Sequence, residues 1–521
     1  MEIFNIKNLS FKYNKSENYA LKNINIKINR GEFLLLIGSS GSGKTTLLRM
    51  LKKELTPLGE ISGEILFNGE NIDNLSDRDS VSKIGFIMQD PDSQIVTDKV
   101  YSELAFGLEN LGCKRETVCS KVAELSSCFG FSDIIEKSTD KLSGGEKQLL
   151  NLASVIAMNP EVIILDEPVS MLDPIYALKL INMLKQLNDD FGVTVIVAEH
   201  HLQEIFKYAD RVLCIENGGI IAENSPRDIC ADLKDSIIES TLPIPARLFN
   251  RLKTESSCTI TVKEGRELLS SFKVSDNNSY LELKHNDLAL SCKNIFFRYE
   301  KQGRDILKGL NFNIKKGEIY ALMGENGCGK STLLNVINGN IKPYRGKVRF
   351  NSRIAYLPQN PKYVFTKDKL SDDLNTADNK NLELVDKLEL NELLDSHPYD
   401  LSGGELQRAA MCKILLSDPD IILLDEPTKG LDTYAKDKLG DILRTLTDIG
   451  KTVILVSHDV EFCAEYSDRC GLLFNGEITS EGSVREFFGG NIFFTTAASK
   501  MSKGIIENAV TIEDIIRCID G

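Results

Sequence analysis

Two copies of a short glycine-rich segment constrain the fold of this chain more than any other feature. Residues 38–45 read GSSGSGKT and residues 324–331 read GENGCGKS, so both fit the pattern G-x-x-x-x-G-K-[ST]. In this pattern the glycines let backbone N–H groups surround phosphate oxygens, the Lys reaches the β- and γ-phosphates, and the hydroxyl binds Mg²⁺. An apolar run precedes each copy and a helical pattern follows it, as such a loop requires. We therefore predict two phosphate-binding loops rather than two glycine-rich surface turns.

The bulk composition limits the class of protein. A chain of 521 residues is too long for one hydrophobic core, so roughly two to four domains are expected. A net charge of -14 disfavours a large nucleic-acid-binding surface. The 12 cysteines include no C-x-x-C pair, which favours reduced cytosolic thiols over disulfides or a zinc site. Residues 1–10 lack the apolar core of a signal peptide, and apolar runs such as 193–198 are far shorter than a membrane span. Any membrane role would therefore need a partner.

A tyrosine precedes each loop and a glutamine follows it. Tyr13 and Tyr299 lie the same number of residues before the two loop lysines. Such a ring could stack on an adenine or pack as a strand aromatic in the core, and the identical spacing favours stacking. Gln89 and Gln359 each end an apolar strand pattern and open a polar loop. The stretch before the glutamine is shorter in the second copy, which we interpret as the loss of a surface hairpin and loop around residues 71–82.

A serine followed by two glycines opens a predicted helix in each half. Residues 142–148 read LSGGEKQ and residues 401–407 read LSGGELQ. Ser143 and Ser402 could be ordinary N-caps. A glycine pair behind a serine at a helix start also makes an anion site. Because two nearly identical copies occur, we favour the anion site.

Paired carboxylates end a predicted buried strand in each half. Apolar residues lead directly into Asp166 and Glu167, and again into Asp425 and Glu426. An Asp at a strand end beside a phosphate loop can hold Mg²⁺ through water. The Glu after it can orient or deprotonate an attacking water. The pattern therefore predicts a hydrolytic site in each half.

The next predicted strand ends in a histidine in each half. A lone histidine is usually structural, but His200 and His458 follow equivalent strands, which favours contact with a γ-phosphate. The flanking residues differ, because residues 199–201 read EHH and residues 457–459 read SHD. The first half thus lacks the acid after the histidine but keeps the histidine itself.

The duplicated motifs divide the chain into two similar α/β halves. Apolar runs fit buried parallel strands, and the alternating residues 9–28 fit an antiparallel sheet. Thr261 and Thr511 each precede an acidic helix start, which indicates a repeated helical extension unless the two short caps are alike by chance. The predicted boundaries are 1–235 for the first domain, 236–273 for its extension, 274–287 for a linker, 288–485 for the second domain and 486–521 for the C-terminal extension.

With phosphate loop, glutamine loop, Leu-Ser-Gly-Gly signature, Asp-Glu pair and histidine in one order, each half resembles the ABC ATPases. The resemblance covers nearly the whole chain, twice. It implies two tandem P-loop domains, each with a RecA-like core, an antiparallel β subdomain and an α-helical subdomain. It also implies that the two units pack head to tail, with each ATP between the phosphate loop of one unit and the signature of the other. No motif residue is degenerate, so both sites are expected to hydrolyse ATP with Mg²⁺.

The resemblance assigns roles to the residues that match each family motif. The implied catalytic residues are Gln89, Glu167, His200, Gln359, Glu426 and His458. The implied nucleotide-binding residues of the first loop are Tyr13, Gly38, Ser39, Ser40, Gly41, Ser42, Gly43, Lys44, Thr45 and Thr46, completed by Ser402 and Gly404. Those of the second are Tyr299, Gly324, Glu325, Asn326, Gly327, Cys328, Gly329, Lys330, Ser331 and Thr332, completed by Ser143 and Gly145. The implied Mg²⁺ ligands are Thr45, Gln89 and Asp166, and Ser331, Gln359 and Asp425.

Within that family, residues 89–94 and 103–108 resemble the ATPases of energy-coupling factor (ECF) importers. These importers take up vitamins, their precursors, or cobalt and nickel ions, and fused ATPases with a shortened second unit occur among them. The resemblance implies a transmembrane coupling subunit near the glutamine loops, a separate substrate-binding membrane protein, and a peripheral position at the cytoplasmic face of the membrane. Residues 100–111 are predicted to form an amphipathic helix with Glu103 and Glu109 exposed.

Two other classes of protein also use paired ATPase units. A translation factor of the ABC-F type would have a long charged helical linker and an Arg after each signature. Here the expected linker is short and polar, Gln148 follows the first signature, and Arg408 appears only after the second. The acidic net charge also disfavours ribosome binding. A DNA-repair or chromosome ATPase would carry zinc cysteines or long coiled coils, which the sequence lacks.

Overall fold

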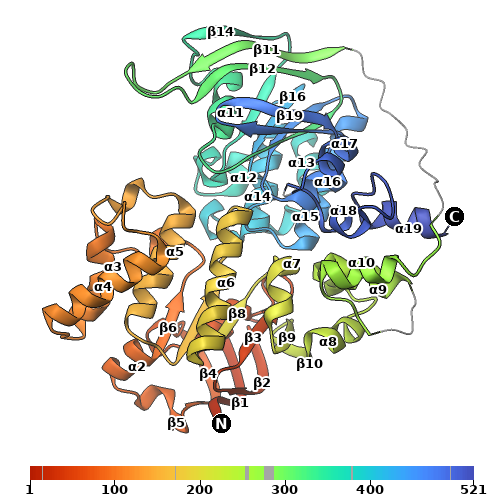
Figure 1. Cartoon of the computed structure of the whole chain (residues 1–521). Coiled ribbons are helices and arrows are strands. Elements are labelled where there is room, and N and C mark those ends of the chain that lie inside the picture. The colour runs from red at the N-terminus through yellow and green to blue at the C-terminus, as the bar shows by residue number, and fades with distance from the viewer. Residues whose placement is uncertain are drawn as a thin grey trace. The chain divides into compact units, whose positions relative to one another are not determined.

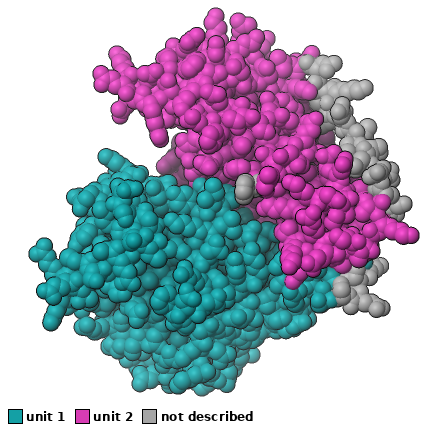
Figure 2. Space-filling view, in the orientation of Figure 1, with its two compact units in different colours: residues 1–261 teal, residues 262–521 magenta. Residues whose placement is uncertain are grey.

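The computed structural model describes residues 1–14, 16–170, 172–252, 257–274, 287–376, 379–492 and 494–520. The chain forms two compact units, residues 1–261 and 262–521 (Figure 2). The division falls within the predicted extension 236–273, and most of the predicted linker 274–287 lies outside the described residues. In these ranges no helix is both long and apolar enough to cross a membrane.

Unit 1 is built on two sheets (Figure 1). The larger sheet has the order β10-β9-β3-β8-β7-β6, parallel except for β10 at its edge. Its strands are β3 (Phe33–Ile37), β6 (Ile84–Ile87), β7 (Val162–Asp166), β8 (Thr194–Ala198), β9 (Arg211–Glu216) and β10 (Gly219–Asn224). The smaller, antiparallel sheet has the order β2-β1-β4-β5, with β1 (Glu2–Tyr13), β2 (Leu21–Asn29), β4 (Gly59–Phe67) and β5 (Glu70–Asn71).

The central strands of unit 1 are apolar on both faces, which explains their continuous hydrophobic runs. Alternate residues enter two different core clusters: Leu35 and Val197 belong to one, and Leu34 and Ile196 to the other. In the parallel register Asp166 of β7 pairs with Ala198 of β8. The carboxyl ends of β3, β7 and β8 therefore meet at one edge of the sheet, and the loops that follow them share that edge.

The helices of unit 1 include a subdomain formed by α3, α4 and α5. The helices are α1 (Lys44–Met50), α2 (Asp77–Lys83), α3 (Val100–Asn110), α4 (Arg115–Phe129), α5 (Gly144–Ala157), α6 (Pro174–Phe191), α7 (Leu202–Ile205), α8 (Pro226–Asp232) and α9 (Ile244–Leu252). The helix predicted at 100–111 is confirmed, but the predicted exposure of Glu103 is wrong. Its carboxylate is buried and accepts hydrogen bonds from the backbone N–H groups of Val96 (3.2 Å) and Thr97 (2.9 Å).

Unit 2 repeats this plan, and in the described residues its antiparallel sheet has three strands in place of four. Its sheets have the orders β15-β16-β17-β13-β18-β19 and β12-β11-β14. The strands are β11 (Leu288–Phe297), β12 (Leu307–Lys315), β13 (Ile319–Met323), β14 (Arg345–Phe350), β15 (Ile354–Leu357), β16 (Ile421–Asp425), β17 (Thr452–Val456), β18 (Arg469–Phe474) and β19 (Glu477–Ser483). The helices are α10 (Val262–Leu269), α11 (Lys330–Asn338), α12 (Leu370–Asp373), α13 (Asn379–Lys387), α14 (Gly403–Leu415), α15 (Thr433–Asp448), α16 (Val460–Tyr466), α17 (Val484–Gly490), α18 (Ala497–Ser502) and α19 (Ile512–Asp520). Helix α10 packs on α18.

Each unit thus combines a mixed, RecA-like sheet with a smaller antiparallel sheet, which confirms the predicted α/β class with two tandem domains. The segment that unit 2 lacks holds β5 and α2 in unit 1. The hairpin and loop expected around residues 71–82 are wrong: β4 and β5 form a hairpin just before this stretch, which itself holds a short 3-10 turn and most of α2. Ser76 caps that helix by accepting a hydrogen bond from the N–H of Asp79 (3.1 Å).

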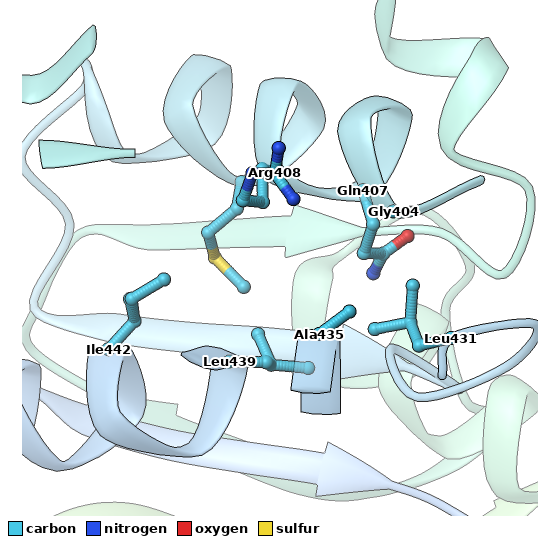
Figure 3. A pocket seen from close by; sticks show the side chains of 8 residues that line it. Gly404, Gln407, Arg408, Leu431, Ala435, Leu439 and Ile442 are labelled. Carbon is cyan, nitrogen blue, oxygen red and sulfur yellow. The ribbon is translucent and has the colours of Figure 1, made fainter. Parts of the chain in front are cut away.

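The two units differ in how the signature helix meets the next long helix. In unit 2 a small pocket separates α14 from α15 and is lined by Gly404, Ala435 and Leu439 among others (Figure 3). In unit 1 the residue equivalent to Ala435 is Tyr176, and its ring lies against Gly145. The pocket exists because alanine in unit 2 leaves the space that tyrosine fills in unit 1.

Candidate functional site

The phosphate loops connect β3 to α1 in unit 1 and β13 to α11 in unit 2. Gly38 and Gly43 have φ values of 145° and 107°, a region that side chains rarely adopt. A Cβ atom on Gly38 would also lie 2.0 Å from the carbonyl oxygen of Ile215, so the backbone approach itself requires glycine. The buried Lys44 donates through Nζ to the carbonyl oxygens of Gly38 (2.8 Å) and Ser39 (2.9 Å). The backbone of the loop therefore curves around the ammonium group of Lys44.

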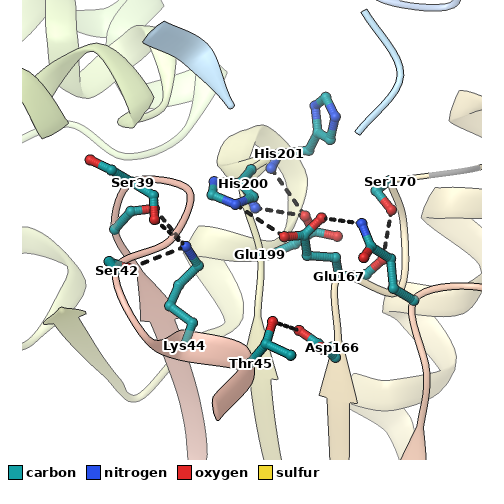
Figure 4. Close-up of polar contacts among 12 residues, drawn as sticks. Ser39, Ser42, Lys44, Thr45, Asp166, Glu167, Ser170, Glu199, His200 and His201 are labelled. Atoms are coloured by element: carbon teal, nitrogen blue, oxygen red, sulfur yellow. Dashed lines mark hydrogen bonds and ion pairs between the residues drawn. The ribbon is translucent and has the colours of Figure 1, made fainter. Parts of the chain in front are cut away.

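A hydroxyl and a carboxylate meet beneath each loop. Thr45 Oγ1 donates to Asp166 Oδ1 at 3.0 Å (Figure 4), and Ser331 Oγ donates to Asp425 Oδ1 at 3.1 Å. Oxygen atoms of these two kinds are the ligands that Mg²⁺ prefers, so the residues present fit that ion. Burial, with repulsion from Glu167, raises the pKa of Asp166 to about 6. A divalent cation would supply the positive charge that favours the ionised carboxylate.

The two predicted catalytic glutamates share an unusual backbone conformation. Glu167 and Glu426 have φ values of 46° and 53°, in the left-handed region that is costly for residues other than glycine. Their N–H groups donate to the carbonyl oxygens of Ala198 and Val456, each at 2.9 Å. In each unit the chain therefore changes direction at the glutamate, directly after the strand that ends in the aspartate.

In unit 1 the three predicted catalytic residues come together. Gln89 Nε2 donates to Glu167 Oε2 at 2.7 Å, and His200 Nε2 lies 3.1 Å from Glu167 Oε1. Burial acts to raise the pKa of Glu167, but the hydrogen bond and charge of His200 outweigh it and hold the pKa below its usual value. Glu167 is therefore an ionised carboxylate at neutral pH.

Unit 2 assembles the corresponding residues differently. His458 Nε2 lies 3.1 Å from Glu426 Oε1, 2.9 Å from Asn326 Oδ1 and 3.1 Å from Lys330 Nζ. Burial and the neighbouring lysines lower the pKa of His458 to about 3, and burial raises that of Glu426 to about 7. Within the described part of unit 2, the exposed Gln359 makes no hydrogen bond to Glu426. The histidine and glutamate meet in both units, whereas in the described residues the glutamine reaches the glutamate in unit 1 alone.

The tyrosines ahead of the loops are equivalently placed. The hydroxyl of Tyr13 lies 3.0 Å from Thr46 Oγ1, and that of Tyr299 lies 3.1 Å from Thr332 Oγ1. Each ring packs edge-on against a phenylalanine two residues earlier, with centroids 4.8 Å and 4.9 Å apart. Tyr299 is 68% exposed and Tyr13 38%, so one side of each ring can receive a base. Adenine stacking stays a prediction.

The signature serines begin α5 and α14 as N-caps. Ser143 accepts a hydrogen bond from the N–H of Glu146 (3.3 Å), and its own N–H donates to Glu146 Oε2 (2.7 Å). The N–H and hydroxyl of Ser402 both donate to Glu405 Oε2, at 2.9 Å and 2.7 Å. The capping interpretation is thus correct for both serines, and the anion site stays a prediction.

Sequence reasoning missed two polar side chains at these sites. Tyr356 Oη donates to Asp425 Oδ2 at 3.2 Å, and nothing in the pattern of its strand distinguishes it from a core aromatic. Glu199 is fully buried beside His200. An acidic residue directly after a buried apolar strand was a signal for a satisfied internal carboxylate.

Comparisons with known proteins agree with this geometry. A family model described as "ABC transporter" matches residues 21–170 and 307–429. Relatives provisionally named as ABC transporter ATP-binding proteins occur in Bacillus thuringiensis subsp. konkukian (strain 97-27) and Bacillus cereus (strain ATCC 10987 / NRS 248). Each is 39% identical over 98% of this chain and 97% of the relative. The archaeal ribosome recycling factor aABCE1, solved with the ribosomal stalk protein aP1, is similar at a TM-score of 0.64 and 22% identity, covering 93% of this chain and 91% of that one. That last likeness shows a common fold alone.

Proposed function

The chain belongs to the ABC transporter family, and we propose that it is the ATP-hydrolysing energy-coupling subunit of an ECF-type importer. The cargo would be a vitamin, a vitamin precursor or a transition-metal ion. One observation carries the enzymatic part of this proposal. In both units a glutamate and a histidine meet at 3.1 Å, at the sheet edge that also carries the phosphate loop.

The residues of each unit suit phosphoryl transfer to water. The loop N–H groups and Lys44 or Lys330 bind and neutralise the phosphates. Glu167 or Glu426 orients the attacking water and accepts its proton, and the histidine contacts the γ-phosphate. Mg²⁺, when bound, neutralises charge that develops on the phosphate oxygens. This reaction needs positioned charges more than a covalent intermediate.

We propose that neither loop is complete by itself. Lys44 would work with Ser402 and Gly404, and Lys330 with Ser143 and Gly145. This pairing is supported by the resemblance of the sequence motifs to those of the family. ATP would then favour a closed arrangement of the two halves, and hydrolysis would release it, because a ligand shifts an equilibrium only by binding one state more tightly.

The ECF assignment is supported by the resemblance of residues 89–94 and 103–108, and the names of the relatives support a transporter role in general. It requires a transmembrane coupling subunit and a substrate-binding membrane protein, with this chain held peripherally at the cytoplasmic face. Helix α3 begins after the glutamine loop and presents Phe106, which is 44% exposed. An exposed aromatic side chain on this helix suits a contact with a partner helix.

The test is affinity purification of the tagged full-length chain from membranes, followed by identification of the proteins that come with it. We expect membrane proteins, and we expect Phe106→Asp to lose them while it retains ATP hydrolysis. Glu109→Gln, an exposed change on the same helix, is the matched control and should retain the partners. Recovery of ribosomes in place of membrane proteins would refute the transporter assignment and support the ABC-F alternative.

A further inference from the structure

Glu199 is a buried acid between the last residue of β8 and His200. Its side chain accepts three backbone hydrogen bonds, and Figure 4 shows those from His200 and His201. The N–H of Val169 donates to Oε1 at 3.0 Å, and the N–H groups of His200 and His201 donate to Oε2 at 2.7 Å and 3.2 Å. Hydrogen bonds to a carboxylate are among the stronger ones in proteins. Both carboxylate oxygens are therefore committed to the backbone.

These bonds join the two segments that carry the Glu167–His200 pair. Val169 lies in the turn after Glu167, where the Ser170 hydroxyl donates to the Glu167 carbonyl oxygen at 2.9 Å. His200 belongs to the other segment, and its ring reaches Glu167 at 3.1 Å. The Glu199 carboxylate thus holds both backbone segments in place. The His200 ring and the Glu167 carboxylate, which these segments carry, contact each other.

Unit 2 holds the same two segments by different chemistry. At the position of Glu199 it has Ser457, and at that of Val169 it has Thr428, with their hydroxyl oxygens 2.9 Å apart. It also has an ion pair of Lys436 Nζ with Asp459 Oδ2 at 2.7 Å. The equivalents in unit 1 are alanine and histidine, which cannot form that pair. In unit 1 a carboxylate joins the two segments, whereas in unit 2 a pair of hydroxyl groups joins them and the ion pair lies beside it.

We propose that Glu199 is a positioning residue that sets the geometry of His200 and Glu167 for hydrolysis in unit 1. The proposal rests on the proposed ATPase function of the chain. It implies that the hydrolysis rates of the two sites can change independently. The two segments are held by one carboxylate in unit 1, and by a hydroxyl pair with a neighbouring ion pair in unit 2. Loss of Glu199 should lower turnover without weakening ATP binding, since Lys44 and the loop are not among its partners.

The test isolates unit 1 by placing Glu426→Gln in the full-length chain. In that parent we expect Glu199→Gln to lower kcat at least about tenfold and to leave KM within about twofold, because an amide can accept through its oxygen alone. Glu199→Ser should lose a similar factor. Adding Val169→Thr to it should restore at least about threefold, because the two hydroxyls then copy the pair found in unit 2.

The matched control is Glu109→Gln in the same parent, which makes the same Glu-to-Gln change at an exposed position of unit 1 and should leave kcat within about twofold. An unchanged kcat in folded Glu199→Gln, or no rescue by Val169→Thr, would overturn the positioning role. Equal losses in kcat and ATP affinity would indicate a general structural role and would overturn it as well. If the Glu426→Gln parent binds ATP but hydrolyses none even in a single turnover, the proposed hydrolysis in unit 1 is wrong, and the proposal falls with it.

Discussion

The same substitution at two equivalent glycines should have opposite effects on the two units. A Cβ atom on Gly145 would lie 2.5 Å from Cγ of Tyr176 and 2.8 Å from both Cδ atoms. On Gly404 its nearest neighbour would be Cβ of Ala435, at 3.8 Å, which is ordinary van der Waals contact. The difference arises because a pocket lies beside Gly404 in unit 2 (Figure 3). In unit 1 the ring of Tyr176 occupies the corresponding space beside Gly145.

The size of each effect can be set by two terms. Inserting a methyl group into a filled site costs about 1–3 kcal/mol. Replacing glycine by alanine in a helix gains up to about 1 kcal/mol. Gly145→Ala should therefore destabilise α5 by roughly 1–2 kcal/mol, whereas Gly404→Ala should leave α14 unchanged or stabilise it by up to about 1 kcal/mol. Tyr176→Ala should relieve the clash, with a coupling energy of about 1–3 kcal/mol in a double-mutant cycle.

Hydrogen exchange measured separately on the amides of α5 and α14 suits this prediction, because two units need not unfold in one step. We expect faster exchange in α5 for Gly145→Ala and slower or unchanged exchange in α14 for Gly404→Ala. Protection of α5 should return in the double variant Gly145→Ala with Tyr176→Ala. The packing argument is refuted if the two glycine variants behave alike, or if removing the ring restores nothing.

Three further predictions concern buried groups of unit 1. Gly38→Ala should abolish ATP binding by unit 1, because its Cβ would lie 2.0 Å from the Ile215 carbonyl oxygen. Equilibrium dialysis should then find one ATP site per chain, and two remaining sites would contradict the prediction. Burial, with repulsion from Glu167, raises the pKa of Glu199 from 4.5 to about 7. The folded chain therefore holds this proton longer than the unfolded chain, and about 3 kcal/mol of unfolding free energy should be lost as pH rises from about 4.5 to about 7. Urea midpoints of Glu199→Ser should fall less over that window, and equal slopes would contradict the assignment. Glu103→Ala removes the acceptor of the Val96 and Thr97 N–H groups and empties a buried side-chain site, which should cost about 2–4 kcal/mol. The exposed Glu109→Ala should stay within about 0.5 kcal/mol in the same urea titration, and equal effects would contradict the prediction.

Much of the fold could be predicted because local patterns and tertiary structure agree in this chain. The continuous apolar runs of β3, β7 and β8 are buried on both faces, and the glycines of the phosphate loop adopt backbone angles that other residues avoid. Duplication added information, since a motif found twice in one order is hard to explain by chance. The predicted histidines and glutamates follow neighbouring parallel strands in both units, and their catalytic roles stay predictions.

Other features depended on contacts that sequence spacing does not reveal. Glu103 looks like a solvent-facing residue of an amphipathic helix, but the amides of the preceding loop satisfy its carboxylate inside the protein. Gln89 and Gln359 occupy the same place in the motif, yet in the described residues Gln89 alone reaches a glutamate. Helix α2 was missed because a seven-residue polar helix has no apolar periodicity, although Ser76 supplied a capping signal.

The central claim is that each unit hydrolyses ATP with its own glutamate, and steady-state turnover of the full-length chain tests it most directly. Glu167→Gln and Glu426→Gln should each lower the rate and retain bound ATP, because the amide keeps the shape of the side chain but cannot accept a proton. With both changes the rate should fall by at least about 100-fold, the contribution expected of a general base. A double variant that turns over ATP at the rate of the unmodified chain would contradict the claim, because hydrolysis would then not use these carboxylates.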